Sequence, residues 1–390
     1  MTARKDGRLG AIDALRGAAA LSVVAYHAIN FTDAVPVSRW LSAVHAVLDR
    51  GYLGVPLFFV ISGFCIHLRA AARHAQSGEQ RVDYLAFWKR RLLRLYPPYV
   101  AALCVSMALV IVAYLLGRNV PLLALYAEPK AKSIAVDFAM HLTMLHGFHP
   151  VFDKAGGNPP FWTLAREEYF YVMYFALLAW RRRFDAVTTA ASILALGVAF
   201  PILVRPFLPD GAAWTALLMS SAVVLWIQWC LGMVAVENYV GLVRLPSWCS
   251  AIWLVPVWGC GAAYSDITVP LAAPALWGMT FFTLVNYCVT RETAGEWPRH
   301  RIVKWLEGVG IYSYSLYLIH NPVRGVMNQI LPVWFRAQPI AYIAAAAIIA
   351  VAGCVAGRIF YLVIESRFLP SRRPHVPEAR LIPAEVLAQS

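Results

Sequence analysis

The sequence predicts an all-α fold, a polytopic membrane helix bundle of about ten transmembrane helices with both termini in the cytoplasm. The 390-residue chain is 60% hydrophobic and only 14% charged, whereas a soluble protein needs more charge to cover its surface. Apolar runs of about 20 residues, long enough to cross a bilayer as helices, recur along the chain. Basic residues concentrate between these runs, as the positive-inside rule requires.

Ten apolar runs define the expected spans. The first contains Asp13 and Arg16 and precedes nine others, which indicates a retained helix and not a cleaved signal peptide. Residues 133–148 are a candidate for a short or re-entrant helix. The transmembrane domain is expected over 1–370, with a cytoplasmic tail at 371–390. The spans lie near residues 11–30, 52–70, 96–117, 160–180, 186–205, 214–236, 249–264, 271–290, 309–331 and 339–365.

The distribution of Lys and Arg sets the predicted orientation. With the N-terminus in the cytoplasm, cytoplasmic segments hold 22 of the 34 basic residues, the opposite segments hold 8, and 4 lie within spans. This asymmetry favours cytoplasmic termini. It also assigns the net charge of +13 to orientation and not to nucleic-acid binding. The seven cysteines lie mostly in apolar runs without a CxxC pair, so neither a disulfide framework nor a metal site is expected.

Ionisable residues within a span are costly to bury and are therefore candidate functional residues. The first span carries Asp13, Arg16 and His27. At a rise of about 1.5 Å per residue, Arg16 and His27 lie roughly 16 Å apart along the axis. Arg16 is then near the cytoplasmic end and His27 in the outer half. A structural ion pair is the alternative for Asp13 and Arg16, and a hydrogen-bonded core histidine is the alternative for His27.

The fourth span, near 160–180, opens with Phe161 and Trp162 and places Arg166, Glu167 and Glu168 below the outer surface. His27 lies at a comparable depth, so a His–Glu pair is expected in the outer half. A carboxylate orients an imidazole and stabilises its protonated form, which makes the histidine a usable general base. Adjacent helical residues point about 100° apart, so at most one glutamate faces His27. A packing salt bridge between Arg166 and one glutamate is the structural alternative.

A basic run enters the third span from the cytoplasm at Arg90, Arg91 and Arg94. Arg91 and Arg94 are one turn apart, so their guanidinium groups can hold one polyanion together. Positive-inside anchoring is the more common role of such a run.

Two further spans carry polar groups. Ser62 lies mid-span beside a glycine, where close packing is the alternative. The ninth run has recurring hydroxyls, including Ser315, which also suit interhelical hydrogen bonds. His320 follows at mid-membrane before Asn321 and Pro322, and the proline either frees a carbonyl to polarise a site or kinks the helix.

Taken in order, these stretches resemble the acyltransferase 3 family of integral membrane acyltransferases. Each motif alone is weak, whereas five in the family's order are specific. The likeness runs from residue 9 to about 322, and the ten-span count extends it to about 365. The matching stretches are Ile12-Asp-Ala-Leu-Arg16-Gly with His27, Phe58-Phe-Val-Ile-Ser-Gly-Phe64, Arg90-Arg-Leu-Leu-Arg94 with Tyr96-Pro-Pro-Tyr99, Asn158-Pro159 with Trp162-Thr-Leu-Ala-Arg-Glu167-Glu-Tyr-Phe-Tyr171, and Tyr314-Ser-Leu-Tyr-Leu-Ile-His320.

The resemblance implies transfer of an acyl group, usually acetyl from acetyl-CoA, to a hydroxyl of an extracytoplasmic carbohydrate or glycoside. It places the family's Arg-x10-His element on Arg16 and His27, its Arg-x-x-Arg on Arg91 and Arg94, and its span-four glutamate on Glu167. Some members of the family carry a further soluble domain at the C-terminus. Because this sequence ends about 25 residues after the last expected span, the resemblance implies a stand-alone transmembrane form.

The residues and the resemblance combine into one expected mechanism. The basic cluster that includes Arg90 binds the phosphates of CoA on the cytoplasmic face. His27, oriented by Glu167, removes the proton of an acceptor hydroxyl that arrives from outside. Direct transfer is favoured over an acyl-enzyme because no serine or cysteine is visibly activated. Residues expected to stabilise the oxyanion or line the site are Arg16, Asp13, Ser62, Trp162, Glu168, Ser315 and His320.

A proton-coupled multispan transporter or exporter is the main alternative, because buried His, Glu and Arg in ten spans suit one. Consumption of labelled acetyl-CoA by membranes distinguishes the two. The other large class of membrane O-acyltransferases also uses a membrane histidine, but these motifs do not resemble it. The expected location is the inner membrane of a bacterial cell. The expected partners are the lipid bilayer, acyl-CoA and a carbohydrate acceptor, without nucleic acid.

Overall fold

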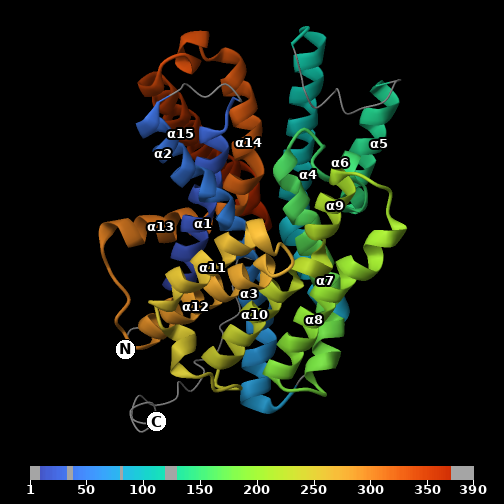
Figure 1. The fold of residues 1–390 in the computed structure, drawn as a ribbon, viewed down its shortest axis with the longest axis vertical. Helices are drawn as coiled ribbons and strands as arrows, with labels where there is room; N and C mark the ends of the chain where they lie inside the picture. The colour runs from blue at the N-terminus through green and yellow to red at the C-terminus, as the bar shows by residue number, and fades with distance from the viewer. Residues whose placement is uncertain (1–8, 33–37, 80–81, 119–129, 370–390) are drawn as a thin grey trace.

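The computed structural model describes residues 9–32, 38–79, 82–118 and 130–369, which form helices and turns without a strand. The predicted all-α class is confirmed for them (Figure 1), and the expected tail at 371–390 lies outside the described residues. Short 3-10 turns connect several helices. The α-helices are α1 (Gly10–Ile29), α2 (Arg39–Asp49), α3 (Gly54–Ser77), α4 (Tyr84–Leu115), α5 (Lys130–Leu142), α6 (Pro150–Asp153), α7 (Trp162–Arg181), α8 (Ala186–Val204), α9 (Ala212–Met219), α10 (Ala222–Tyr239), α11 (Leu254–Thr268), α12 (Ala273–Thr293), α13 (Arg301–Ile311), α14 (Ser313–Ile330) and α15 (Pro339–Val363).

Six helical segments of the described chain are long and apolar enough to cross a membrane, so the chain is a multi-pass membrane protein. The remaining expected spans correspond to α7, α11, α12 and α14. Two of these helices are too short or too charged to meet the same requirement of length and apolar character. α11 has only 15 residues, and α7 carries three adjacent charged residues, Arg166 to Glu168. The six segments are Gly10–Ile29, Arg39–Ser77, Tyr84–Leu115, Ala186–Phe207, Ala212–Tyr239 and Pro339–Val363.

Two expected spans are interrupted. The span near 214–236 is divided into α9 and α10 at Ser220 and Ser221. This break frees the Ser220 carbonyl, which accepts a hydrogen bond of 2.7 Å from Nε of the buried Arg166. The span near 309–331 is divided at Tyr312, where α13 ends and α14 begins in a new direction. The apolar pattern predicts where both segments lie. It does not predict the breaks within them, because the groups that contact the chain at each break are distant in sequence.

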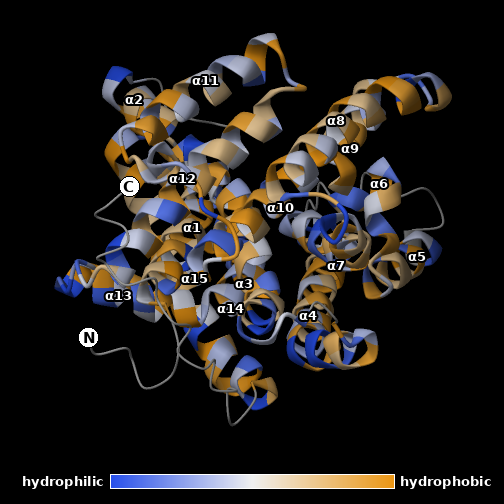
Figure 2. Cartoon of the chain, turned by 90° about the horizontal axis from the view of Figure 1, so that it is seen from below, coloured by the Kyte–Doolittle hydropathy of each residue, from blue (hydrophilic) through white to orange (hydrophobic). Residues whose placement is uncertain are grey.

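The outward faces of several helices are apolar. Val187 and Leu203 on α8, and Val351 and Leu362 on α15, are each more than half exposed. Figure 2 shows hydrophobic residues along α8 at the edge of the bundle. Exposed aliphatic faces of this kind are what lipid chains cover.

Glycines allow a close crossing of α3 and α10. Gly63 of α3 lies against the Trp229 carbonyl of α10, and Gly232 of α10 lies against the Val60 carbonyl of α3. A Cβ atom at either glycine would overlap the opposing carbonyl oxygen. Small residues let membrane helices approach this closely and gain van der Waals contact. The crossing holds α3, which carries Ser62, against α10.

Gly232→Val is expected to destabilise the bundle, because the added side chain forces α3 away from α10. Overpacking of this kind costs about 1–3 kcal/mol, and thermal unfolding of the purified protein in detergent measures it as a lower Tm. Gly261→Val is the matched control, since no atom lies within 4 Å of a Cβ placed at Gly261 in α11. Equal losses in the two variants would contradict the account of the crossing.

Candidate active site

A cavity of about 130 Å³ lies where α1, α3, α4, α7 and α14 meet. Aromatic and aliphatic side chains form part of its wall, including Phe58 of α3 and Tyr317 of α14. Five residues expected at the site line it together, although they come from four helices: Arg16, Ser62, Arg91, Arg94 and Glu167. Three guanidinium groups and one carboxylate give the cavity a positive balance.

Arg16 and Arg91 are the cationic groups with spare bonding capacity. Within the described ranges, neither forms a hydrogen bond or ion pair, and Nε of Arg91 is buried. The Arg91 guanidinium lies 5.7 Å from the Phe87 ring and 5.9 Å from the Tyr171 ring, in cation–π range of both. The rings position the group without using its N–H donors. A guanidinium held in this way is ready to bind an anion.

The carboxylate of Glu167 is bound to hydroxyl groups. It accepts hydrogen bonds from Ser62 Oγ at 2.8 Å and from the Tyr171 hydroxyl at 2.6 Å. Ser62 Oγ also accepts a hydrogen bond of 3.3 Å from the Trp229 indole. These contacts connect α3, α7 and α10 at the wall of the cavity. They leave the carboxylate positioned next to the arginines.

His27 lies beside His320 and not beside Glu167. The two imidazole rings are 5.1 Å apart, centre to centre. In the part of the chain that the structure describes, no hydrogen bond or ion pair joins His27 to Glu167. The expectation that Glu167 orients His27 directly is therefore corrected. Glu167 lines the cavity with Arg16 and the start of α14, whereas His27 lies beside His320, about two turns further along α14, so the two residues lie at different depths. The Glu167 carboxylate faces Ser62 and Tyr171.

His320 has a defined tautomer and an open acceptor. Its Nδ1 is 3.1 Å from the Leu316 carbonyl oxygen, which can only accept, so Nδ1 carries the hydrogen. Nε2 is therefore an acceptor, and it is buried without a hydrogen-bond partner among the described residues. The ring of Tyr317, which lines the cavity, lies 5.7 Å from the His320 ring. Tyr317 thus separates the cavity from the histidine pair.

Two other predicted residues lie near the cavity without lining it. Trp162, the first residue of α7, places its ring 5.7 Å from the Arg166 guanidinium. Glu168 faces a smaller adjoining cavity with Glu167 and Tyr96.

Three predicted residues lie further away. Asp13 lies in the first turn of α1, where its carbonyl contacts Gly310. Ser315 donates a hydrogen bond of 2.5 Å to the buried Glu365, so its role is helix contact and not lining of the cavity. Arg90 is exposed on α4, outside the cavity. Glu365 escaped the sequence analysis because it falls at the very end of the last expected span.

The segment between α4 and α7 is fastened to α14 beside Tyr317. Asn158 Nδ2 donates a hydrogen bond of 2.8 Å to the Leu318 carbonyl, and Thr163 Oγ1 lies 2.7 Å from the Tyr317 hydroxyl. Inside the segment, His141 and His146 stack at 3.9 Å. Burial and the adjacent His141 lower the pKa of His146 to about 3, so its ring is neutral at neutral pH. Residues 130–161, the described part of this segment before α7, therefore pack over this part of α14.

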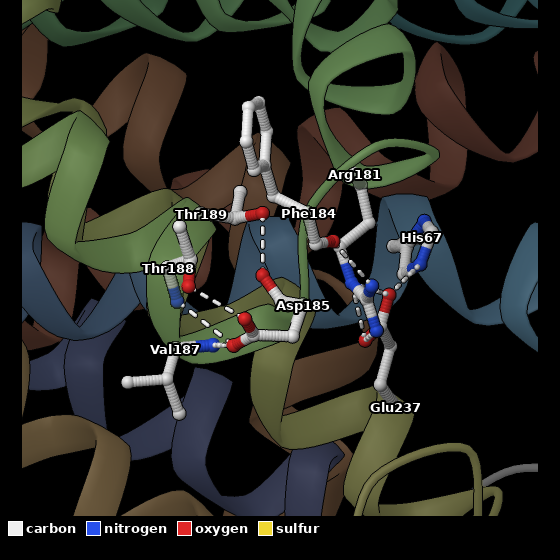
Figure 3. A network of polar contacts seen from close by, with 8 residues as sticks. All are labelled: His67, Arg181, Phe184, Asp185, Val187, Thr188, Thr189 and Glu237. Carbon is white, nitrogen blue, oxygen red and sulfur yellow. Dashed lines mark hydrogen bonds and ion pairs between the residues drawn. The ribbon is translucent and has the colours of Figure 1, made fainter.

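An ion-pair network that the sequence analysis missed connects three helices (Figure 3). Arg181 of α7 donates to both oxygens of Glu237 of α10, at 2.7 to 3.1 Å. His67 of α3 lies 3.3 Å from the same carboxylate and 2.9 Å from the Tyr174 hydroxyl. Arg181 also donates to the Phe184 carbonyl in the turn before α8. The rule that an ionisable residue in a span is a functional candidate would have selected His67, which lies in the expected span 52–70, whereas Glu237 falls one residue past the expected span 214–236.

Asp185 starts α8 at the edge of this network. Its carboxylate accepts hydrogen bonds from the backbone N–H groups of Val187 and Thr188, at 2.8 and 2.9 Å. Hydrogen bonds from Thr188 lower the pKa of Asp185. A charged N-cap at neutral pH satisfies free N–H groups and suits the helix dipole.

A second missed ion pair supports the start of α7. Arg166 is buried and donates to Asp153 of α6 at 2.7 Å. Asp153, and not an adjacent glutamate, is therefore the partner of Arg166. Sequence alone gave no signal for this pair, because Asp153 lies in an irregular segment outside the spans.

Comparison with known proteins identifies the family. A family model described as an acyltransferase domain matches residues 9–359. The chain belongs to the acyltransferase 3 family. The predicted resemblance is thereby confirmed over nearly the whole chain. No solved structure matches the chain.

Three curated relatives match part of the chain. O-acetyltransferase OatA of Staphylococcus aureus (strain NCTC 8325 / PS 47) is 29% identical over 168 residues, which cover 43% of this chain and 24% of the relative. Putative peptidoglycan O-acetyltransferase YrhL of Bacillus subtilis (strain 168) is 31% identical over 168 residues, which cover 42% and 22%. Protein 2 in picA locus of Rhizobium radiobacter is 37% identical over 111 residues, 28% and 50%. The chain spans about a quarter of the length of the first two relatives.

Glu237→Gln is expected to lower the free energy of unfolding by about 2 kcal/mol. Removing one partner of a buried pair costs about 3–5 kcal/mol, and we reduce this because the Arg181 side chain is 22% exposed. Thermal unfolding in detergent measures the change. Glu296→Gln is the control, since its pair with Arg291 is about half exposed and worth at most about 1 kcal/mol. A loss no larger than that of the control would contradict the structural role of the network.

Proposed function

We propose that the chain is a membrane O-acyltransferase that moves an acetyl group from cytoplasmic acetyl-CoA to a carbohydrate hydroxyl on the opposite face. In this proposal, ten helices span the inner membrane and both termini are cytoplasmic, as the basic segments require. The observation that carries it is the cavity in which Arg16 and Arg91 have no hydrogen-bond or ion-pair partner among the described residues. The family assignment favours an enzyme over the transporter alternative.

The donor enters from the basic end of α4. CoA carries several phosphate charges at one end and the thioester at the other, and guanidinium groups bind phosphate well. A cavity of about 130 Å³ is small beside ordinary ligand pockets of roughly 300–1,000 Å³. It therefore has room for the acyl thioester and not for the nucleotide. The nucleotide phosphates lie toward the mouth, where Arg91 and Arg94 meet the exposed Arg90 and the nearby Arg69.

Transfer follows a direct displacement. The acceptor oxygen attacks the thioester carbonyl carbon, and the carbon–sulfur bond breaks as the ester forms. His27 takes the proton from the acceptor hydroxyl and returns it to the departing sulfur, so CoA leaves as a thiol. His320 positions the His27 ring through the contact between the two rings, whose centres are 5.1 Å apart. Arg16 lines the part of the cavity through which the donor reaches the histidine pair, since it lies roughly 16 Å along α1 from His27.

Glu167 has a supporting part in this scheme. Its hydrogen bonds fix Ser62 and Tyr171 at the cavity wall. Its negative charge offsets part of the repulsion among the three arginines before the donor binds. The carboxylate is thus a positioning group and not the partner of His27.

The acceptor is proposed to be a carbohydrate hydroxyl that reaches the histidine pair from the outer side. The relatives support this class, since one is named as an O-acetyltransferase and another as a putative peptidoglycan O-acetyltransferase. The ordered segment at Asn158, fastened to α14, forms part of the acceptor path. A cell-wall or surface glycan is the class of acceptor to test first.

His27→Ala is expected to lower kcat for acetyl transfer at least about 100-fold, because general-base catalysis contributes about 10²–10⁴. The assay follows labelled acetyl groups from acetyl-CoA to a glycan acceptor, with purified protein in vesicles. His300→Gln is the control, since that histidine is exposed and distant from the cavity. Full activity of the His27 variant would show that the base lies elsewhere.

Arg91→Gln combined with Arg94→Gln is expected to raise the KM for acetyl-CoA at least about tenfold, because each charged hydrogen bond contributes about 1.5–3 kcal/mol. Protection of Cys65 from a thiol reagent measures donor binding separately, since that thiol lines the cavity. The double variant Arg182→Gln, Arg183→Gln removes equal charge elsewhere and should leave KM unchanged. An unchanged KM in the variant of Arg91 and Arg94 would show that these arginines only orient the protein in the membrane.

A further inference from the structure

α13 is a short helix that lies across α1 (Figures 1 and 2). On its exposed side it carries two basic residues, Arg301 and Lys304. Ile302 and Trp305 lie beside them and are 72% and 57% exposed. Neither basic side chain forms an ion pair or hydrogen bond with any residue in the described part of the chain. The helix therefore presents unneutralised charge next to unburied apolar surface.

The inner side of α13 is fixed to α1. Gly310 lies against the Asp13 carbonyl, and Gly17 lies against the Leu306 carbonyl, so a Cβ atom at either glycine would overlap the other helix. Asp13 and Gly17 flank Arg16 by three residues and by one. Movement of α13 would therefore move the part of α1 that places Arg16 in the cavity.

The start of α1 is held by the same region. Both carboxylate oxygens of Glu292, at the end of α12, accept hydrogen bonds of 2.7 Å from the N–H groups of Gly10 and Ala11. The buried Glu307 of α13 accepts a hydrogen bond from the Trp297 indole. The chain from Glu292 to Gly310 thus holds the first two turns of α1 in place, and we call it the clamp.

We propose that α13 is an interfacial helix that binds the anionic phospholipid headgroups of the cytoplasmic leaflet and so holds α1 in position. Tryptophan favours the boundary between headgroups and acyl chains, and Lys and Arg pair with headgroup phosphates. The end of α1 that carries α13 is the cytoplasmic end in the predicted orientation. Lipid is favoured over a protein partner because one face of an eleven-residue helix is small beside the roughly 800 Å² per partner of a stable interface.

The test measures lipid affinity, which does not depend on the proposed function. Phosphatidylglycerol is titrated against the purified full chain in neutral detergent, and bound lipid is counted by native mass spectrometry. For Arg301→Gln with Lys304→Gln we expect affinity to fall on the order of tenfold, since each basic residue contributes about 1 kcal/mol. Arg39→Gln with Lys154→Gln is the control, since both residues are exposed and lie on the opposite side in the predicted orientation, and it should change affinity less than twofold. Soluble glycerol 3-phosphate should not compete.

Four results would overturn the proposal. These are unchanged affinity in the α13 variant, equal losses in both double variants, full competition by glycerol 3-phosphate, and binding of a second protein chain that replaces the lipid. Thermal unfolding in detergent without phosphatidylglycerol shows that each variant is folded. If the double variant is not folded, Lys304→Gln alone is used. Its affinity for phosphatidylglycerol is then expected to fall by about half of the tenfold loss on a logarithmic scale.

The link to α1 rests on the proposed function and is tested separately. In vesicles that contain phosphatidylglycerol, acetyl transfer by the wild type should be severalfold faster than in phosphatidylcholine alone. The α13 variant should lose this difference. If the wild type transfers no acetyl group in any vesicle, the proposed function fails while the affinity measurement still decides the lipid site. If both proteins respond equally to phosphatidylglycerol, the clamp does not control α1.

Discussion

The cost of charge inside an apolar helix bundle governs this structure. Most buried ionisable side chains are satisfied by a specific partner: Arg166 by Asp153 and a freed carbonyl, and Glu237 by Arg181 and His67. These pairs determine where helices break and which helices adjoin. Arg16 and Arg91 stand apart, because they have no such partner among the described residues and face a cavity. Groups left in that state are explained by a ligand that supplies the missing negative charge.

The fold class and the places of the helices follow from hydrophobicity alone, because apolar runs and basic junctions are local signals. The family motifs also selected Arg16, Arg91 and Glu167 as site residues, and the structure brings them together at one cavity with Ser62. Residue counting alone placed Glu167 at the depth of His27 and not at the depth of Arg16. The pairing of His27 was not predictable. Residue counting gives depth only relative to the assumed ends of each span, whereas the offset of a helix along its neighbours depends on contacts between distant segments, such as the Gly63–Gly232 crossing that places Ser62.

The polar residues form a path through the bundle. It begins at the exposed basic end of α4, continues through the arginine cavity to Tyr317, and ends at the His320–His27 pair. Each step depends on a different packing contact. Aromatic rings hold Arg91, hydroxyls hold Glu167, and a backbone carbonyl fixes the tautomer of His320. The bundle is therefore more than an anchor in lipid, since its packing aligns a donor side with an acceptor side.

The central claim is that the donor and the acceptor are used from opposite faces of the membrane. Oriented vesicles with the acceptor glycan confined to the outer face test it most directly, with labelled acetyl-CoA, which does not cross the bilayer, supplied on one side at a time. Labelled glycan should form when acetyl-CoA is supplied at the cytoplasmic face and not when it is supplied with the acceptor. Labelling only when donor and acceptor share one face would contradict the path described here.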